Sequence, residues 1–232
     1  MSLPDRARPR GDCDYLIRPY QAADGQAVRE ICVRTCWMGD YRPECIIDAW
    51  TWAQFWTRYY TDTQPQHCWV AVHRDSRQVA GYLTGTPDAR GEDRYQRRVL
   101  PGIVAHVLRR RLMRQAMPRA AAWAMVRSAV RGELACPPNV LRSYPATFHL
   151  DLLAQARGQG LGGRLVGVFL DQMRAAGVSG VHIRPMAINA ALLALAKKHQ
   201  FVLLDSRPLT AFAHVERRQI EIQTYGLRLG PT

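Results

Sequence analysis

The stretch from Phe148 to Arg164 reads FHLDLLAQARGQGLGGR and decides the fold. It opens with a mostly apolar run of strand length, from Phe148 to Leu153. Glycines then crowd together at Gly158, Gly160, Gly162 and Gly163. Apolar residues return afterwards at helical spacing, at Leu165, Val166, Phe169, Leu170 and Met173. This pattern predicts a strand, a glycine-rich turn and the start of a helix.

The predicted turn is suited to binding an anion. Glycine has no Cβ, so a ligand can approach the backbone closely. The N-terminus of a helix offers free N–H groups and the positive end of its dipole, and most often holds a phosphate or pyrophosphate. Arg157 and Arg164 flank the turn and add charge suited to phosphate. A tight turn that serves only helix–strand packing is the alternative interpretation.

Two familiar phosphate-binding patterns fit this stretch less well. The P-loop of nucleoside triphosphatases ends in Gly-Lys-Ser/Thr, whereas here Gly163 is followed by Arg164. The dinucleotide pattern G-x-G-x-x-G is present at Gly158, Gly160 and Gly163. That pattern normally opens a doubly wound domain, and too little chain follows to build one. The acidic residue expected after the second strand is also missing, since Arg184 stands there.

The segment QARGQG, from Gln155 to Gly160, resembles the Q/R-x-x-G-x-G/A signature of the GNAT superfamily of N-acetyltransferases. A second segment, 17–31, is similar to the opening strand and helix of that superfamily. The runs 85–88 and 144–153, with a helical segment between them, resemble one branch in particular. This branch contains bacterial acetyltransferases similar to the C-terminal acetyltransferase-like domain of O-GlcNAcase. The resemblance covers most of the chain from about Tyr15 onward.

This resemblance implies transfer of an acetyl group from acetyl-CoA, as co-substrate, to an amine of a small molecule or peptide. It implies that the strand backbone orients the pantetheine arm, that the glycine turn holds the pyrophosphate, and that Asn189 contacts the coenzyme arm. The expected cofactor-binding residues are Leu152, Leu153, Gln155, Arg157, Gly158, Gln159, Gly160, Leu161, Gly162, Gly163, Arg164 and Asn189.

Three residues are candidates for the catalytic base. Asp151 and His149 lie two apart and therefore share one face of the predicted strand. Either side chain could accept a proton directly or through water. Asp88, at the end of the third predicted strand, is the third candidate. A structural hydrogen-bonding role for Asp151 and a packing role for His149 are the alternatives.

The helix after Asn189 departs from the superfamily pattern N-x-x-A-x-x-F-Y-x-x-x-G-F. Aligning Asn189 and Phe201 places Leu195 and Ala196 at the Phe-Tyr positions and Gln200 at the glycine. The tyrosine that often protonates the leaving thiolate is therefore absent. Two functions follow: an active N-acetyltransferase, which we favour, and a non-catalytic acyl-CoA-binding pseudo-acetyltransferase module. A dinucleotide-dependent reductase is a distant third.

The fold class expected is α/β (α+β). We predict a GNAT-like mixed, mostly antiparallel twisted sheet of about seven strands, with helices on both faces. Residues 1–14 are expected to be a disordered tail, and 15–232 a single acetyltransferase domain. Residues 89–143 are expected to be a helical insertion, with Pro118 ending its first helix and 136–139 forming a loop. The predicted strands span residues 15–20, 67–72, 78–85, 148–153, 180–184, 201–204 and 219–229.

An aromatic segment, 38–60, precedes the predicted hairpin of the second and third strands. Trp52, Phe55, Trp56 and Tyr59 fall at helical spacing in it. We favour a role for these side chains in the core. A wall of the acceptor pocket is the alternative, because aromatic side chains are common there.

The composition of the chain limits which binding partners and which cellular compartment we expect. The net charge of +13 favours polyanions such as coenzyme A, but no nucleic-acid recognition motif accompanies it. The six cysteines include no C-x-x-C pair, so no metal site is expected. No apolar run is long enough to span a bilayer, and residues 1–14 lack a signal-peptide pattern. We therefore expect a cytoplasmic enzyme without membrane contact, and a homodimer is possible.

Overall fold

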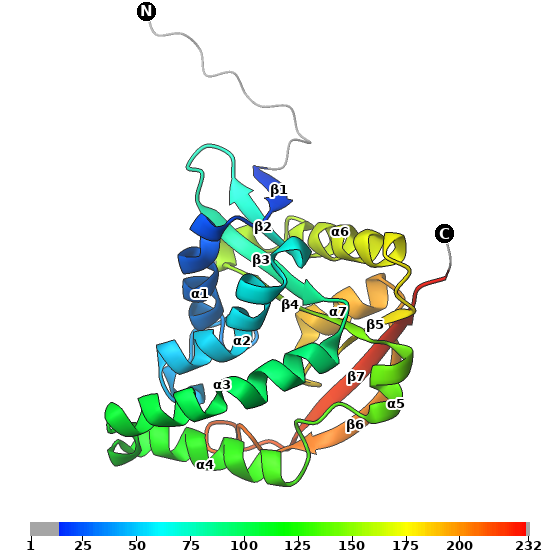
Figure 1. Ribbon diagram of the computed structural model, residues 1–232. Helices are drawn as coiled ribbons and strands as arrows, with labels where there is room; N and C mark the ends of the chain where they lie inside the picture. The colour runs from blue at the N-terminus through cyan, green and yellow to red at the C-terminus, as the bar shows by residue number, and fades with distance from the viewer. Residues whose placement is uncertain (1–13, 231–232) are drawn as a thin grey trace, which may run out of the picture.

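The structure is a computed structural model that describes residues 14–230. The described chain forms a seven-stranded sheet in the order β1-β2-β3-β4-β5-β7-β6 (Figure 1). Every neighbouring pair is antiparallel except β4 and β5, which are parallel. The strands are β1 Tyr15–Pro19, β2 Cys68–His73, β3 Val79–Thr86, β4 Ala146–Leu152, β5 Gly180–Ile183, β6 Val202–Leu209 and β7 Ile220–Arg228. The predicted fold class is confirmed, while the predicted tail lies outside the described residues except for Asp14.

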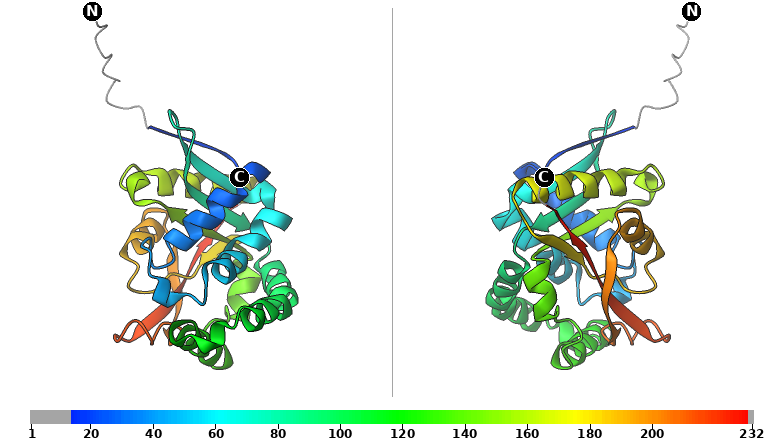
Figure 2. Two further views of the ribbon diagram at one scale, coloured as in Figure 1. Left: turned by 90° about the vertical axis from the view of Figure 1, so that its left-hand side faces the viewer. Right: turned by 90° about the vertical axis from the view of Figure 1, so that its right-hand side faces the viewer.

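Helices cover both faces of the sheet (Figure 2). The α-helices are α1 Gly25–Arg34, α2 Ala49–Thr63, α3 Ala89–Arg109, α4 Ala116–Val130, α5 Pro138–Ser143, α6 Leu161–Ala175 and α7 Ala190–Lys198. Short 3₁₀ turns are η1 Ala22–Asp24, η2 Pro43–Cys45, η3 Pro65–His67, η4 Leu112–Arg114 and η5 Ala154–Ala156.

Strand β2 explains the two-sided core. Its side chains alternate between the faces of the sheet, as in any strand. Trp69 and Ala71 pack in the main core beneath α6 and α7. Val70 and Val72 point the other way and pack against α1. A strand that is apolar on both faces needs cover on both, which the flanking helices provide.

The pairing of β4 creates an open edge in the middle of the sheet. Against β3 the strand is paired from Thr147 to Leu152. Against β5 the pairing comprises Ala146 with Val181 and Thr147 with His182. Beyond these pairs β4 continues without β5 beside it. Because the Leu153 N–H donates to the Ala80 carbonyl on β3, strand alternation turns the amides of Leu150 and Leu152 toward the open side.

The segment 89–143 is helical, as expected, but its boundaries differ from the prediction. Pro118 does not end a helix; it lies in the first turn of α4, where its missing N–H has no intrahelical acceptor to lose. Pro138 likewise begins α5, in a stretch predicted to be a loop. In Figure 1, α3 and α4 form a hairpin at one end of the molecule, and α3 packs against α2.

Two local features complete the description of the fold. Asp24 stands at the N-cap position of α1, but its carboxylate is engaged elsewhere. It accepts hydrogen bonds from the Arg18 guanidinium at 2.7 and 2.8 Å and from the Gln21 N–H at 2.8 Å. The predicted strand 201–204 is longer than expected, because β6 continues through Pro208 to Leu209 at the edge of the sheet. An edge strand tolerates proline since one side of its ladder is unpaired.

Candidate active site

The glycine turn lies between η5 and α6. Gly158 and Gly160 have φ angles of +75° and +73°, a left-handed conformation that residues with a side chain rarely adopt. A Cβ added at either position would meet no atom within 4 Å, so space is open above the turn. The amides of Leu161, Gly162 and Gly163 begin α6 and have no acceptor within the helix. The turn is therefore a backbone cradle open to an anion.

Cations around the turn are arranged differently from the prediction. A Cβ on Gly163 would lie 3.0 Å from the Lys198 ammonium nitrogen, so this lysine lies over the first turn of α6. Arg164 is exposed beside it. The guanidinium of Arg157 is engaged with the Leu152 carbonyl at 3.0 Å, the Gly39 carbonyl, and Asp40. Arg157 thus braces the turn, and Lys198 is a cation that the sequence pattern did not reveal.

Three further predicted cofactor residues have structural partners. The Gln159 side-chain amide donates to the Gln155 carbonyl at 2.9 Å and closes the turn. Leu153 is buried in the core cluster on the α1 side of the sheet. The Asn189 Oδ1 accepts a hydrogen bond from the Leu192 N–H at 3.1 Å and so caps α7. Asn189 also lines the cavity described next.

A cavity of about 360 Å³ lies beside the open part of β4, between α2, α3 and β5. Its volume is in the range of small-molecule sites. Trp52, Phe55, Trp56 and Tyr60 of α2 line it, whereas Tyr59 packs in a core cluster with Tyr60 and Cys68. Within the aromatic segment, Tyr59 therefore packs in the core as expected, while four other α2 side chains line the cavity. The polar and charged side chains on the wall include Glu92, Asp93, Gln96, His149, Asp151, His182, Arg184 and Asn189.

Asp151 is the principal candidate for a base. Its side chain is 17% exposed, and its Oδ2 accepts a hydrogen bond from the Tyr82 hydroxyl at 2.6 Å. Burial raises the pKa of this carboxyl to about 7, while the hydrogen bond from Tyr82 holds it from rising further. A carboxyl with a pKa near the working pH is suited to accept a proton.

His149 lies close to Asp151 on the same strand face, as predicted. The His149 Nδ1 is 3.9 Å from the Asp151 Oδ2, and the His149 ring is 4.6 Å from the Trp56 ring, centroid to centroid. Among the described residues, its Nδ1 is buried without a hydrogen-bond partner. Burial lowers the pKa of His149 to about 4, so the imidazole is neutral at pH 7. The two groups therefore do not form an ion pair at neutral pH.

Asp88 is not brought to the cavity. It is the N-cap residue of α3, and its Oδ1 accepts a hydrogen bond from the Arg90 N–H at 3.0 Å. Its Oδ2 is 3.1 Å from the exposed Arg94 guanidinium. An aspartate directly before a helical pattern is a recognised capping signal, so this role was available from the sequence.

The positions that depart from the superfamily pattern have clear structural roles. Ala196 is 1% exposed and packs in the main core, so this position supplies no proton donor. Gln200 follows α7 with a φ of +62°, in the conformation for which glycine is favoured. Tyr225 of β7 could otherwise supply the missing acid, but its hydroxyl donates to the Gln223 side chain at 3.1 Å.

Thiols on the cavity wall are unsuited to nucleophilic catalysis. Cys32, Cys36 and Cys136 line the cavity as free cysteines. Burial raises the pKa of each thiol, that of Cys136 to about 11. Since the thiolate is the nucleophile, these three thiols are unsuited to attack a substrate bound in the cavity.

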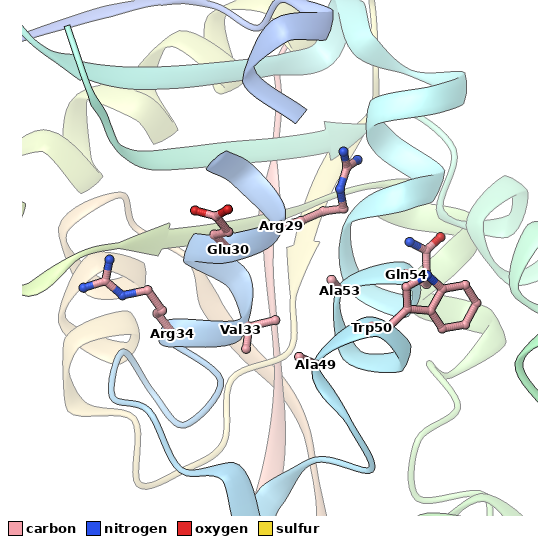
Figure 3. A pocket seen from close by; sticks show the side chains of 8 residues that line it. All are labelled: Arg29, Glu30, Val33, Arg34, Ala49, Trp50, Ala53 and Gln54. Carbon is pink, nitrogen blue, oxygen red and sulfur yellow. The ribbon is translucent and has the colours of Figure 1, made fainter. Parts of the chain in front are cut away.

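A second hollow, between α1 and α2, lacks these features (Figure 3). It is larger, at about 650 Å³, but shallow and open to solvent. Figure 3 labels the side chains that line it, among them Arg29, Glu30 and Arg34 of α1 and Trp50 and Gln54 of α2. None of the predicted site residues lines it, so the cavity beside β4 is the candidate active site.

Residues 14–230 offer neither a cluster of metal-ligating side chains nor a membrane-spanning helix. No group of three or more histidine, cysteine, aspartate or glutamate side chains is placed to hold a metal ion there. In the same part of the chain, no helix combines the length and hydropathy needed to cross a bilayer.

Solved structures with the same arrangement identify the fold. SsHAT matches with a TM-score of 0.62 and 22% identity, over 94% of this chain and all of the other. A GCN5-related N-acetyltransferase from Kribbella flavida matches with a TM-score of 0.56 and 16% identity, over 93% of this chain and 98% of that one. The fold is that of the GNAT N-acetyltransferases.

A third match is relevant to the cofactor. The putative acetyltransferase YncA from Salmonella typhimurium, solved with its cofactor acetyl-CoA, matches the GNAT-like chain with a TM-score of 0.56 and 15% identity. The alignment covers 95% of this chain and 96% of YncA. No protein-family model matches the sequence. The expected GNAT-like fold is thus confirmed by structure, at identities that establish the fold alone.

Proposed function

We propose that the protein is an N-acetyltransferase that uses acetyl-CoA to acetylate an amine, with Asp151 as the general base. The observation that carries this proposal is the position of a half-buried carboxyl with a pKa near 7 on a cavity beside the open edge of β4. The glycine turn comes after β4 in the chain, and the cavity lies beside the same strand. A donor bound along β4 would therefore reach from the turn to the carboxyl.

The residues present fit acetyl-CoA. The backbone cradle at Gly158 and Gly160 leaves open space, and the N-terminus of α6 offers N–H groups to a pyrophosphate. Lys198 and the exposed Arg164 supply positive charge beside it. The unpaired amides of β4 at Leu150 and Leu152 are placed to hydrogen-bond the pantetheine amides, as an added strand would. YncA, which has the same fold, carries acetyl-CoA as its cofactor.

When bound, acetyl-CoA supplies an acetyl thioester: its transfer breaks the C–S bond, forms an amide C–N bond, and leaves one thiol and one amide. The protein must hold the acceptor amine and take up the proton it loses. Asp151, in its ionised form, is positioned to do so. Neutral His149 and the aromatic wall keep the surroundings poorly hydrated, and this desolvation raises the basicity of the carboxylate.

The second candidate function is a module that binds acyl-CoA without turnover. The observation that favours it is Ala196, which stands where the superfamily pattern places a tyrosine acid. The loss need not abolish transfer, since thiols ionise at a pKa of about 8.5 and can leave without a protein acid. We therefore place the active enzyme first.

The proposal also includes the domain boundaries, the branch of the superfamily, the cellular location and the oligomeric state. We propose that residues 15–232 form a single acetyltransferase domain and that 89–143 are an insertion into it. We also propose the branch similar to the O-GlcNAcase acetyltransferase-like domain, a cytoplasmic location and a homodimer. Nucleic acid is not proposed as a partner.

Calorimetric titration with acetyl-CoA tests the binding site. The wild type should bind, and Gly160→Trp should not, because its side chain would fill the cradle. Gly177→Trp is the matched control: Gly177 has a φ of +68° and equally open space at the other end of α6. Equal loss of binding in both variants, or no binding by the folded wild type, would refute the assignment of the turn.

A thiol-release assay with a panel of amines then separates the two functions. Release of free CoA that depends on an added amine supports the enzyme. Binding without release under any acceptor supports the module. Asp151→Asn should bind acetyl-CoA normally but slow release, because it lacks a base while keeping the shape of the side chain.

A further inference from the structure

The cavity has an acidic wall that the chemistry proposed above does not use. Glu92 and Gln96 lie one helical turn apart in the first half of α3, and both line the cavity. They belong to the helical segment 89–143, whereas Asp151 belongs to the central sheet. The cavity therefore has a second polar region, contributed by a different part of the chain.

Gln96 presents an unused hydrogen-bond acceptor there. Its Nε2 donates to the Phe55 carbonyl at 2.6 Å, which fixes the orientation of the side-chain amide. Its Oε1 is buried and, among the described residues, has no hydrogen-bond partner. A buried carbonyl oxygen without a partner is uncommon in proteins and calls for a donor from a ligand or water.

Glu92 adds a carboxyl to the same wall. Burial raises its pKa to about 7, and the carboxyl faces the Tyr60 hydroxyl. Within residues 14–230, no ion pair joins Glu92 to a basic side chain. Phe55 and Trp56 stand on the same cavity, and aromatic faces attract cations. Carboxylate, carbonyl oxygen and aromatic rings together favour a cationic group that donates N–H bonds.

The net charge of the cavity agrees with this. Its wall carries the carboxyls of Glu92, Asp93 and Asp151 and one guanidinium, Arg184. Glu92 and Asp151 have a pKa of about 7 and are partly ionised at pH 7, and a bound cation would favour their ionised forms. Burial lowers the pKa of His149 and of His182 to about 4, so neither is charged at pH 7. The Arg184 guanidinium is held by the carbonyls of Glu133 and Leu134, and Asp93 interacts with it electrostatically. An acidic cavity in a chain of net charge +13 is the reverse of what composition alone would give.

We propose that the acceptor is a small amine with a second positively charged nitrogen group, which binds between Glu92, Gln96 and the aromatic side chains of α2 while its other amine meets Asp151. This assignment rests on the proposed function and names its substrate class. The subsite recognises the positive charge on the acceptor's second nitrogen group. Glu92 is the residue that determines this specificity.

The test uses matched amines of one chain length. The acceptors are 1,4-diaminobutane, with two positive groups, and butylamine, with one. For the wild type, kcat/KM from thiol release should be about tenfold or more higher for the diamine, which corresponds to one charge-assisted hydrogen bond. Glu92→Gln should remove most of this preference by lowering kcat/KM for the diamine. Glu30→Gln is the control, since Glu30 lies on α1 in the shallow hollow.

Binding provides a readout that does not need turnover. Calorimetry should give a lower Kd for 1,4-diaminobutane than for butylamine in the wild type, and equal values in Glu92→Gln. A preference in binding without thiol release would overturn the enzymatic function and support the subsite. Thiol release with no preference for the diamine, or a preference that survives in Glu92→Gln, would overturn the subsite and leave the enzyme standing.

Discussion

Replacing Asp151 with asparagine should raise the free energy of unfolding of the protein and lower the rate of acetyl transfer. In the folded protein, burial raises the pKa of Asp151 from 3.8 to about 7. A rise of about three pKa units corresponds to about 4 kcal/mol of unfavourable free energy for the ionised form. Because the folded-state pKa is above the unfolded one, stability is greatest at low pH and falls as the pH rises from about 4 through 7. Asparagine carries no charge and escapes this loss.

The fit of asparagine at this position is good. Its Oδ1 can accept the hydrogen bond from the Tyr82 hydroxyl, which donates to Asp151 Oδ2 at 2.6 Å. Thr35 lies close to Asp151, and its one hydroxyl proton is donated to the Ile31 carbonyl at 2.6 Å, so its oxygen can accept a hydrogen bond from the asparagine Nδ2. The substitution therefore removes the charge without leaving an unpaired polar atom.

Urea unfolding at two pH values measures the effect. The stability advantage of Asp151→Asn should grow by about 2–3 kcal/mol between pH 5 and pH 8. Asp171→Asn, at a side chain that is 77% exposed, should show no such growth. Acetyl transfer should fall by about 10²–10⁴-fold in Asp151→Asn, as expected for loss of a general base. A stability advantage that is independent of pH would show that burial does not raise the pKa of Asp151. A variant as active as the wild type would show that Asp151 is not the general base.

Three further predictions concern the same region. With butylamine as acceptor, the wild-type rate should rise with pH through about 7 as Asp151 ionises, and this inflection should be absent from the pH–rate profile of Asp151→Asn. Gln200→Gly should stabilise the protein by up to about 1 kcal/mol in urea unfolding, since Gln200 has a φ of +62°; a loss of stability would contradict this. Gly85→Ala should lower the thermal midpoint and cost about 1–3 kcal/mol, because its Cβ would lie 2.3 Å from the Phe169 ring; an unchanged midpoint would contradict it.

The local part of the fold could be predicted from the sequence. The seven strands follow from short apolar runs separated by turn residues, and the glycine turn follows from four closely spaced glycines. Asp151 and His149 were placed on one face because strand side chains alternate, and they lie 3.9 Å apart. These features depend on neighbours in the sequence.

Features that depend on tertiary packing could not be predicted. Lys198 reaches the glycine turn because α7 packs beside α6, and Glu92 reaches the cavity because α3 packs on α2. No periodicity or motif marks either residue. The sequence also gives no sign of the internal partners of Arg157, whose guanidinium donates to the Leu152 and Gly39 carbonyls in the folded chain.

The short contact between β4 and β5 also has a mechanical consequence. The sheet consists of a four-stranded plate, β1 to β4, and a three-stranded plate, β5, β7 and β6, joined along a seam of two residue pairs. Such a seam has fewer hydrogen bonds to break than a fully paired interface, so we expect the sheet to open more readily along this line than between its fully paired strands. Acetyl-CoA bound between the two plates would add hydrogen bonds across the seam. We therefore expect its binding to slow amide hydrogen exchange in the strands of both plates.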